Sequence, residues 1–359
     1  MITLIIFILV LGVLILVHEG GHFIAAKKSG LTVEEFGFGF PPRIFSIKKG
    51  ETTYSVNLIP LGGFVKILGE DGNQPDDPKS FASKSVGIRG LIAVSGVAMN
   101  FLLAAVLLII GFYIGLPQPI DSTNEALAKN IGVQIVAVSG DSPAEKAGIK
   151  AGDFIKYLKI GNVNTNINDV SVFQNLINGN KGKEVIITVQ RGKELHKISA
   201  TPRVNALEGQ GALGIGLVKT GIVSYTWYES IWLGIKSTFV ITWAIITGFL
   251  DLLKNLAVSG KISQDVSGPV GIAVLTNQAA TMGLIYLLQV VAVISLNLSV
   301  LNLMPFPALD GGRLLFMGIE KIKGRKVSPK IENAVHSAGM ILLLILALLI
   351  TYRDILRLK

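Results

Sequence analysis

The stretch LGVLILVHEGGHFIAAKK, residues 11–28, places three ionisable side chains at the end of a long apolar run. None of the first 17 residues has a charged side chain, and His18, Glu19 and His22 follow directly. A charged side chain at the centre of a membrane helix costs about 2.5–3.5 kcal/mol on the insertion scale. Because such residues are rare without a function, the stretch predicts both a membrane span and a site within it.

The composition of the whole chain indicates an integral membrane protein. Half of its 359 residues are hydrophobic, and the mean hydropathy is +0.58. The chain contains no cysteine, which excludes disulfides and thiolate metal sites, so any metal must be bound by His, Asp or Glu. The net charge of +9 predicts no nucleic-acid partner, since basic loops beside membrane helices attract anionic lipid head groups.

The predicted fold is a multi-pass α-helical membrane protein with four transmembrane helices. About 17–20 apolar residues at 1.5 Å each cross the ~30 Å hydrocarbon core of a bilayer. The first apolar run has no Lys or Arg before it, unlike a signal peptide, and this predicts a retained span. The four runs are residues 3–26, 88–116, 283–304 and 336–352.

A fifth apolar run, STFVITWAIITGFL at 237–250, lies between Lys236 and Asp251. Its 14 residues are few for a span. They favour an interfacial or re-entrant helix within an amphipathic region at 221–282. The membrane core is therefore predicted in two halves, residues 1–120 and 283–359.

Residues 51–68 predict a β-hairpin, with one strand on each side of a turn at Pro60–Gly63. The segment is unusually apolar for a surface hairpin. Two interpretations are open: a small soluble hairpin, or a hairpin that dips into the membrane protein.

Residues 121–220 predict a small α+β domain inserted between membrane spans. Short β-like runs such as GVQIVAVS and EVIITVQ alternate there with helical or turn-like segments. The stretch SPAEKAGIKAGDFI (142–155) resembles the signature of PDZ domains, in which a short helix ends at a glycine before an AGD turn and a strand. PDZ domains bind extended peptides by strand addition.

His18 and His22 are four residues apart, so on a helix they lie on one face. With Glu19 they form the H-E-x-x-H pattern of zinc metalloproteases, in which two imidazoles bind the metal and the carboxylate accepts a proton from water. A core histidine bonded to a backbone carbonyl is the alternative for one His, but it does not explain three such residues at this spacing. Gly20 and Gly21 lack side chains and are predicted to let another backbone approach the metal.

Zinc requires a third protein ligand, and the predicted one is Asp310 in NLMPFPALDGGR, residues 302–313. Two prolines in this segment end the preceding helix. Irregular backbone at membrane depth is tolerated only where protein or water surrounds it. The alternative for Asp310 is a helix cap in an ordinary loop. The other histidines are His196, in the predicted PDZ domain, and His336, at the start of the last span.

HEGGH in the first span, NLMPFPALDGG after the third and a PDZ-like domain between them resemble the site-2 protease family of intramembrane zinc metalloproteases. The RseP-like bacterial branch is the most similar, and the resemblance extends over nearly the whole chain. It implies one Zn²⁺ per chain, held by His18, His22 and Asp310, with Glu19 as the catalytic base. RseP itself has two tandem PDZ domains, whereas residues 121–220 have room for one.

The same resemblance implies substrate-binding residues. GVAMN (96–100) looks like the family's G-x-x-x-N motif, GFGF (37–40) like its G-F-G loop, and the hairpin at 51–68 like its membrane-re-entrant β-element. For each asparagine, hydrogen bonding between helices is an open alternative. The implied substrate-binding residues are Asn297, Asn302, Asn100, Gly62 and Gly63.

The two metal-binding motifs constrain the topology. If 237–250 crossed the membrane, Asp310 would emerge on the face opposite to His18, so the zinc hypothesis requires that it does not cross. Residues 27–90 contain nine Lys or Arg and residues 305–335 contain six, which favours a cytoplasmic location for these loops. The active site is then toward the cytoplasmic side of a bacterial inner membrane, and the PDZ-like domain is outside.

The predicted function is hydrolysis of a peptide bond within or next to the transmembrane helix of a single-span protein. The resemblance implies anti-sigma factors and remnant signal peptides as substrates. It also implies a PDZ domain that either filters substrates by their outer domain or binds a peptide terminus. The alternatives are a membrane metal transporter and a catalytically silent PDZ scaffold. The nearly apolar second and fourth spans disfavour the transporter, and the complete set of four site residues disfavours the scaffold.

Overall fold

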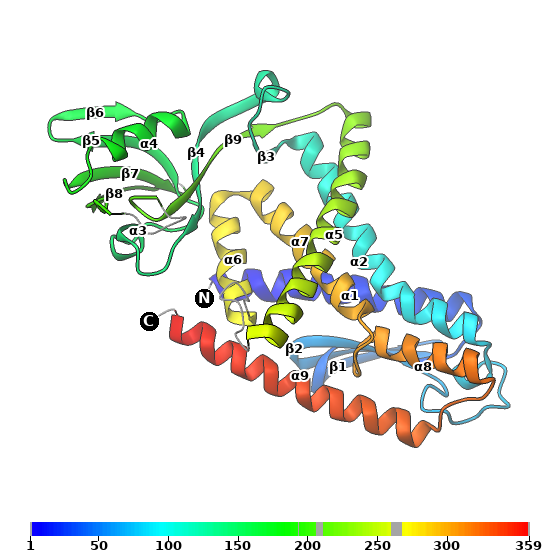
Figure 1. The fold of residues 1–359 in the computed structure, drawn as a ribbon. Helices are drawn as coiled ribbons and strands as arrows, with labels where there is room; N and C mark the ends of the chain where they lie inside the picture. The colour runs from blue at the N-terminus through cyan, green and yellow to red at the C-terminus, as the bar shows by residue number, and fades with distance from the viewer. Residues whose placement is uncertain (1, 193, 206–210, 260–267, 358–359) are drawn as a thin grey trace. The chain divides into compact units, whose positions relative to one another are not determined.

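The computed structural model describes residues 2–192, 194–205, 211–259 and 268–357 (Figure 1). The chain divides into two compact units. The first comprises Met1–Leu108, Gly234–Asn277 and Val290–Lys359, and the second comprises Ile109–Leu233 and Gln278–Gln289.

Five helices in the described part of the chain are long and apolar enough to cross a membrane. They account for all four predicted spans, whose bounds differ by a few residues except that α9 begins at Pro329 rather than at 336. The five are α1 (Ile2–Lys28), α2 (Val86–Ile114), α5 (Trp227–Ser259), α7 (Leu284–Leu303) and α9 (Pro329–Arg357). Two shorter helices, α6 (Pro269–Met282) and α8 (Asp310–Lys323), precede and follow α7.

The helix around residues 237–250 is much longer than the 14-residue apolar run, because α5 has 33 residues. Its most apolar 18-residue window has a mean hydropathy of 1.6. The prediction ended the segment at Lys236 and Asp251 because they are charged. Charged residues are nevertheless compatible with a helix, and no proline interrupts α5. The apolar run is therefore shorter than the helix that contains it.

The strands β1 (Val33–Lys49) and β2 (Thr52–Ile67) form a sheet of their own. Residues 35–38 of β1 pair with residues 63–66 of β2 on one side and with 53–56 on the other. The predicted hairpin across Pro60–Gly63 is therefore wrong, since its two arms are separated by β1.

The prediction missed this central strand because its glycines have low strand propensity. The structure requires one of them, Gly37, since a Cβ there would collide with the ring of Phe64. Residues 40–47 of β1 and 56–59 of β2 expose large apolar side chains. Such a surface is uncommon for a soluble hairpin, and this favours the membrane-inserted interpretation. These side chains are Phe40, Ile44, Phe45, Ile47, Val56, Leu58 and Ile59.

The second unit is an α+β domain built on a seven-stranded sheet of order β3-β9-β4-β5-β7-β8, with β6 paired to β5. Fully buried side chains such as Ile155, Phe173 and Ile187 form its core. Its elements are β3 (Leu116–Pro119), η2 (Glu125–Leu127), β4 (Ala128–Val138), α3 (Pro143–Lys146), β5 (Phe154–Ile160), β6 (Val163–Asn166), α4 (Val170–Asn178), β7 (Val185–Arg191), β8 (Glu194–Ala200) and β9 (Ile215–Val223). A further short helix, η1 (Phe81–Ser83), belongs to the first unit.

The stretch 142–155 has the predicted order of short helix, glycine turn and strand. The hydroxyl of Ser142 caps α3 by accepting from the N–H of Glu145. Gly148 and Gly152 have φ of +84° and +93°, which glycine adopts without a steric cost. β5 follows directly.

Candidate metal centre

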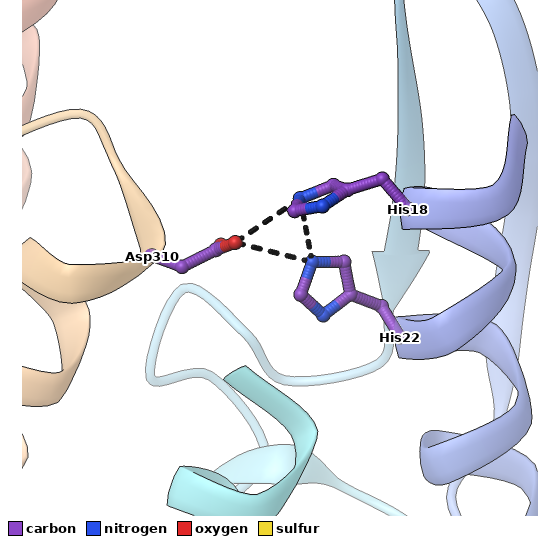
Figure 2. Close-up of side chains that lie close together, drawn as sticks. All are labelled: His18, His22 and Asp310. Atoms are coloured by element: carbon purple, nitrogen blue, oxygen red, sulfur yellow. Dashed lines mark hydrogen bonds and ion pairs between the residues drawn. The ribbon is translucent and has the colours of Figure 1, made fainter. Parts of the chain in front are cut away.

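The two histidines of the H-E-x-x-H motif and the distant aspartate lie together in the first unit. His18 and His22 are on successive turns of α1, and Asp310 is the first residue of α8 (Figure 2). All three side chains are largely buried, with 12% exposure for each imidazole and 19% for the carboxylate. The structure thus brings together residues that are almost 300 positions apart.

The distances between the three donor atoms match a tetrahedral zinc site. Oδ2 of Asp310 is 3.1 Å from Nε2 of His18 and 3.4 Å from Nε2 of His22, and the two Nε2 atoms are 3.3 Å apart. Zinc bound at 2.0–2.1 Å separates tetrahedral ligand atoms by about 3.4 Å. Three protein ligands leave a fourth position open, as in catalytic zinc sites.

The hydrogen bonding of His22 leaves its second ring nitrogen facing Asp310. Its Nδ1 lies 2.7 Å from the carbonyl oxygen of Ile92. A carbonyl only accepts, so Nδ1 carries the proton, and in the neutral ring Nε2 directs a lone pair at Asp310. Two electron-rich atoms then face each other. Their repulsion is removed by a proton on Nε2, which makes the ring a cation, or by a metal ion between the two atoms. An outer partner that fixes the tautomer of a ligating histidine is typical of metal sites.

The electrostatics of Asp310 suit a metal ligand. Burial raises the pKa of this carboxyl, but the hydrogen bonds and positive charge that His18 and His22 supply when their rings are protonated outweigh it and hold the pKa well below its ordinary value. Asp310 is therefore a carboxylate at neutral pH.

Close packing between α1 and α2 shapes the site. A Cβ on Gly21 would collide with the carbonyl of Ser95, and a Cβ on Gly96 would collide with the His22 ring and lie 2.8 Å from Cε1 of His18. Gly21 thus admits another backbone, as predicted, whereas Gly20 faces open space. The prediction did not connect the GVAMN motif with the imidazoles, since the sequence does not show which turn of α2 faces α1.

A cavity of about 250 Å³ adjoins the three donor atoms, and Glu19 lines it. Gly63, Phe64 and Val65 of β2 form another part of its wall. A Cβ on Gly63 would lie 2.9 Å from Cγ of Glu19, so the absence of a side chain lets β2 lie against α1. Residues 63–66 pair with β1 along one edge, and no described strand pairs with the other.

The asparagines predicted to bind substrate do not line this cavity. Asn297 donates from Nδ2 to the carbonyl of Val293 in its own helix, at 2.9 Å. Asn100 is fully buried, and its backbone carbonyl accepts from the hydroxyl of Ser295 on α7 at 2.7 Å. Asn302 is only partly buried. Hydrogen bonding between helices, the alternative, is not seen for two of them either, because Asn297 bonds within α7 and the buried amide of Asn100 has no hydrogen-bond partner among the described residues.

The two predicted glycines differ in position. A Cβ on Gly62 would collide with the ring of Phe40, so Gly62 serves packing within the sheet, whereas Gly63 lines the cavity.

A second cavity of about 530 Å³ shares Glu70, Phe81, Ala308 and Arg313 with the first. Arg313, one turn after Asp310, forms an ion pair with Glu70 where the two cavities meet. The prediction missed both residues. Arg313 does follow directly on LDGG, but nothing in the sequence indicates Glu70 as its partner.

Comparison with known proteins gives consistent matches over the whole length. The model of the family described as Peptidase family M50 matches residues 6–346. A candidate zinc metalloprotease of Clostridium acetobutylicum is 37% identical over 98% of this chain and 97% of its own. The zinc metalloprotease RasP of Oceanobacillus iheyensis is 32% identical over all of both chains. The regulator of sigma-W protease RasP of Bacillus subtilis is 30% identical over 99% of both chains.

The packing of Gly96 against the imidazoles predicts that Gly96→Ala weakens zinc binding. The added methyl group must displace the His22 ring, and we expect zinc affinity to fall by about 10-fold or more, in the range seen when the surroundings of ligands are perturbed. Affinity is measured by competition with a chromophoric chelator. Gly87→Ala is the matched control, because Gly87 also lies in α2 and a Cβ there meets nothing. Equal affinities for the two variants would contradict the packing argument.

Proposed function

The chain belongs to peptidase family M50 and is a zinc metalloprotease, and on this premise we propose that His18, His22 and Asp310 hold the zinc ion and Glu19 is the catalytic base. The observation that carries the assignment is the separation of 3.1–3.4 Å among the three donor atoms. All three belong to one compact unit of the chain.

The proposed chemistry is hydrolysis of a peptide bond. A zinc ion at this site supplies a Lewis acid that activates water near neutral pH and polarises the peptide carbonyl. Glu19 lies on the cavity wall beside the ligands, where its carboxylate accepts the proton of the attacking water and passes it to the leaving amine.

We propose transmembrane segments of single-span proteins as the substrates. A helical substrate has its carbonyls in hydrogen bonds, so it must be extended locally before cleavage. Residues 63–65 of β2 lie on the cavity wall, and the edge of this strand that no described strand pairs can offer backbone groups to an extended substrate. The Bacillus subtilis relative is named a regulator of sigma-W, and by that likeness we include membrane-anchored anti-sigma factors; remnant signal peptides stay a prediction.

Hydrolysis within an apolar environment also needs a supply of water. The 530 Å³ cavity is lined by charged residues, among them Arg89, Glu320 and Lys326. We propose that water reaches the metal from this cavity past the Glu70–Arg313 pair. Cavities lined by polar groups hold water, whereas apolar ones of this size stay dry.

We propose that α5 crosses the membrane and that the chain is back on the same side before α7 begins. From Trp227 to Asp251, 24 residues rise about 36 Å, enough for the hydrocarbon core. Exposed Trp227, Tyr228 and Trp232 near one end suit a membrane interface. The metal hypothesis needs Asp310 on the same side of the membrane as His18. An even number of crossings between α2 and α7 meets this requirement, so residues 237–250 can cross.

The second unit is proposed to be a single PDZ domain on the outer side of a bacterial inner membrane. In favour of this assignment, β3 pairs with Thr220 to Val223 of β9, and no other described strand pairs with the first half of β9 on that edge. α4 packs against β9. A groove between a strand edge and a helix is where PDZ domains bind peptides. Binding of a peptide terminus and filtering by size both remain compatible with this arrangement.

The assignment of Glu19 predicts that Glu19→Gln keeps zinc and loses cleavage. The amide is similar in size but does not accept a proton, so we expect cleavage to fall by about 10²–10⁴-fold. Candidate single-span proteins are co-expressed with the wild type to find one that it cleaves, and this reporter is then tested with the variant. Zinc is measured in both proteins, and Asp310→Ala is expected to lose it. Full cleavage by Glu19→Gln would rule out the mechanism.

The topology predicts that the two ends of α5 are labelled from opposite sides. Tyr228→Cys should react with an impermeant maleimide from outside the cell, and Lys254→Cys only after the membrane is opened. Since the chain has no cysteine, the maleimide labels only the introduced cysteine of each variant. Labelling of both positions from the same side would show that α5 does not cross.

A further inference from the structure

The last membrane helix holds the loop that carries Asp310. Nδ1 of His336, on α9, accepts a hydrogen bond from the backbone N–H of Ala308 at 2.9 Å. One turn along α9, a Cβ on Gly339 would lie 2.5 Å from Cβ and 2.7 Å from the carbonyl oxygen of Pro307. Two residues on one face of α9 therefore contact two consecutive residues of the loop, directly before Leu309 and Asp310.

This loop has a backbone that needs external support. Ala308 has φ of +76°, a left-handed conformation that costs about 1–2 kcal/mol for a residue with a side chain. Gly311 and Gly312, at the start of α8, pack directly against the carbonyls of Met304 and Phe306. Strained backbone persists only where the surroundings determine it. The N–H of Ala308 finds its acceptor on α9 rather than in its own loop.

α9 contacts the rest of the chain at a few defined residues rather than along its whole length. Only 6% of its most apolar window is buried within the chain. His336 also packs against the ring of Phe316 in α8, with centroids 5.6 Å apart. Near the other end of α9, the carboxylate of Asp354 accepts from the N–H groups of Gly268 and Gly271, at 2.9 and 2.8 Å, at the start of α6.

We propose that His336 is a positioning residue for the metal centre. It acts through Ala308 to hold Asp310, two residues later, at the distance that the metal requires. Nδ1 serves as an acceptor, so the imidazole works in its neutral form and is not a zinc ligand. The proposal rests on the proposed role of Asp310 as a ligand, and Gly339 assists by allowing α9 to touch Pro307.

The test compares metal binding and kinetics in full-length protein in detergent. His336→Leu is expected to lower zinc affinity and kcat by about 10–100-fold, the usual effect of losing an outer partner of a ligand. KM for the cleaved reporter should change little, because the wall formed by β2 is intact. The visible bands of the Co²⁺-substituted protein should shift, since they report the geometry of the ligands. His336→Asn should restore all three properties, because its Oδ1 lies near the position of Nδ1 and accepts the same hydrogen bond.

Matched variants separate this role from general stability. Gly339→Ala should reproduce the Co²⁺ shift, whereas Gly318→Ala, in open space on α8, should not. His196→Leu controls for loss of a histidine. Asp354→Ala releases the other end of α9 and should leave the Co²⁺ spectrum unchanged.

Two outcomes would overturn the proposal: wild-type metal binding in His336→Leu, or an equal spectral shift in Asp354→Ala. Zinc retention by Asp310→Ala would instead contradict the assigned ligand set, so failure of the proposed function is distinguishable from failure of this inference.

Discussion

The candidate centre gathers three donor atoms that repel one another unless a positive charge lies between them. Nε2 of His18, Nε2 of His22 and Oδ2 of Asp310 lie 3.1–3.4 Å apart in side chains that are 12–19% exposed. At this separation in a low-dielectric interior their repulsion is poorly screened, and a divalent cation turns it into attraction. The helices are arranged to allow it, since glycines on α1 and α2 let the two backbones approach directly beneath the imidazoles.

This constraint explains why the grouping of His18, His22 and Asp310 was predictable from the sequence. A zinc ligand set tolerates few residue types, and the spacing of His18 and His22 follows from one turn of helix. Asp310 was predictable because two prolines and two glycines around it indicate a helix that stops at membrane depth. The apolar spans were predictable for the same kind of reason, since bilayer thickness sets their minimum length.

The features that the sequence did not predict depend on contacts between distant segments. Charged residues at its flanks hid the length of α5, although they do not interrupt a helix. The central strand of the β1–β2 sheet was hidden by its glycines, one of which, Gly37, packs against Phe64. His336 stood in the sequence as a rival ligand, and only the fold shows that it faces Ala308 rather than the metal. In each case the sequence shows the type of residue, but it does not show which distant residue lies next to it in the fold.

The positions of the asparagines bear on how a substrate is held. Asn297 bonds within its own helix and Asn100 is buried between α2 and α7, so neither amide faces the cavity beside Glu19. Part of the wall of that cavity is formed instead by Gly63, Phe64 and Val65 of β2, which no described strand pairs with on its other edge. Side-chain amides would select particular groups on a substrate, whereas a strand edge bonds to any extended main chain. A protease that uses such an edge selects segments that unwind easily, because the cost of breaking the substrate helix is the term that differs most between sequences.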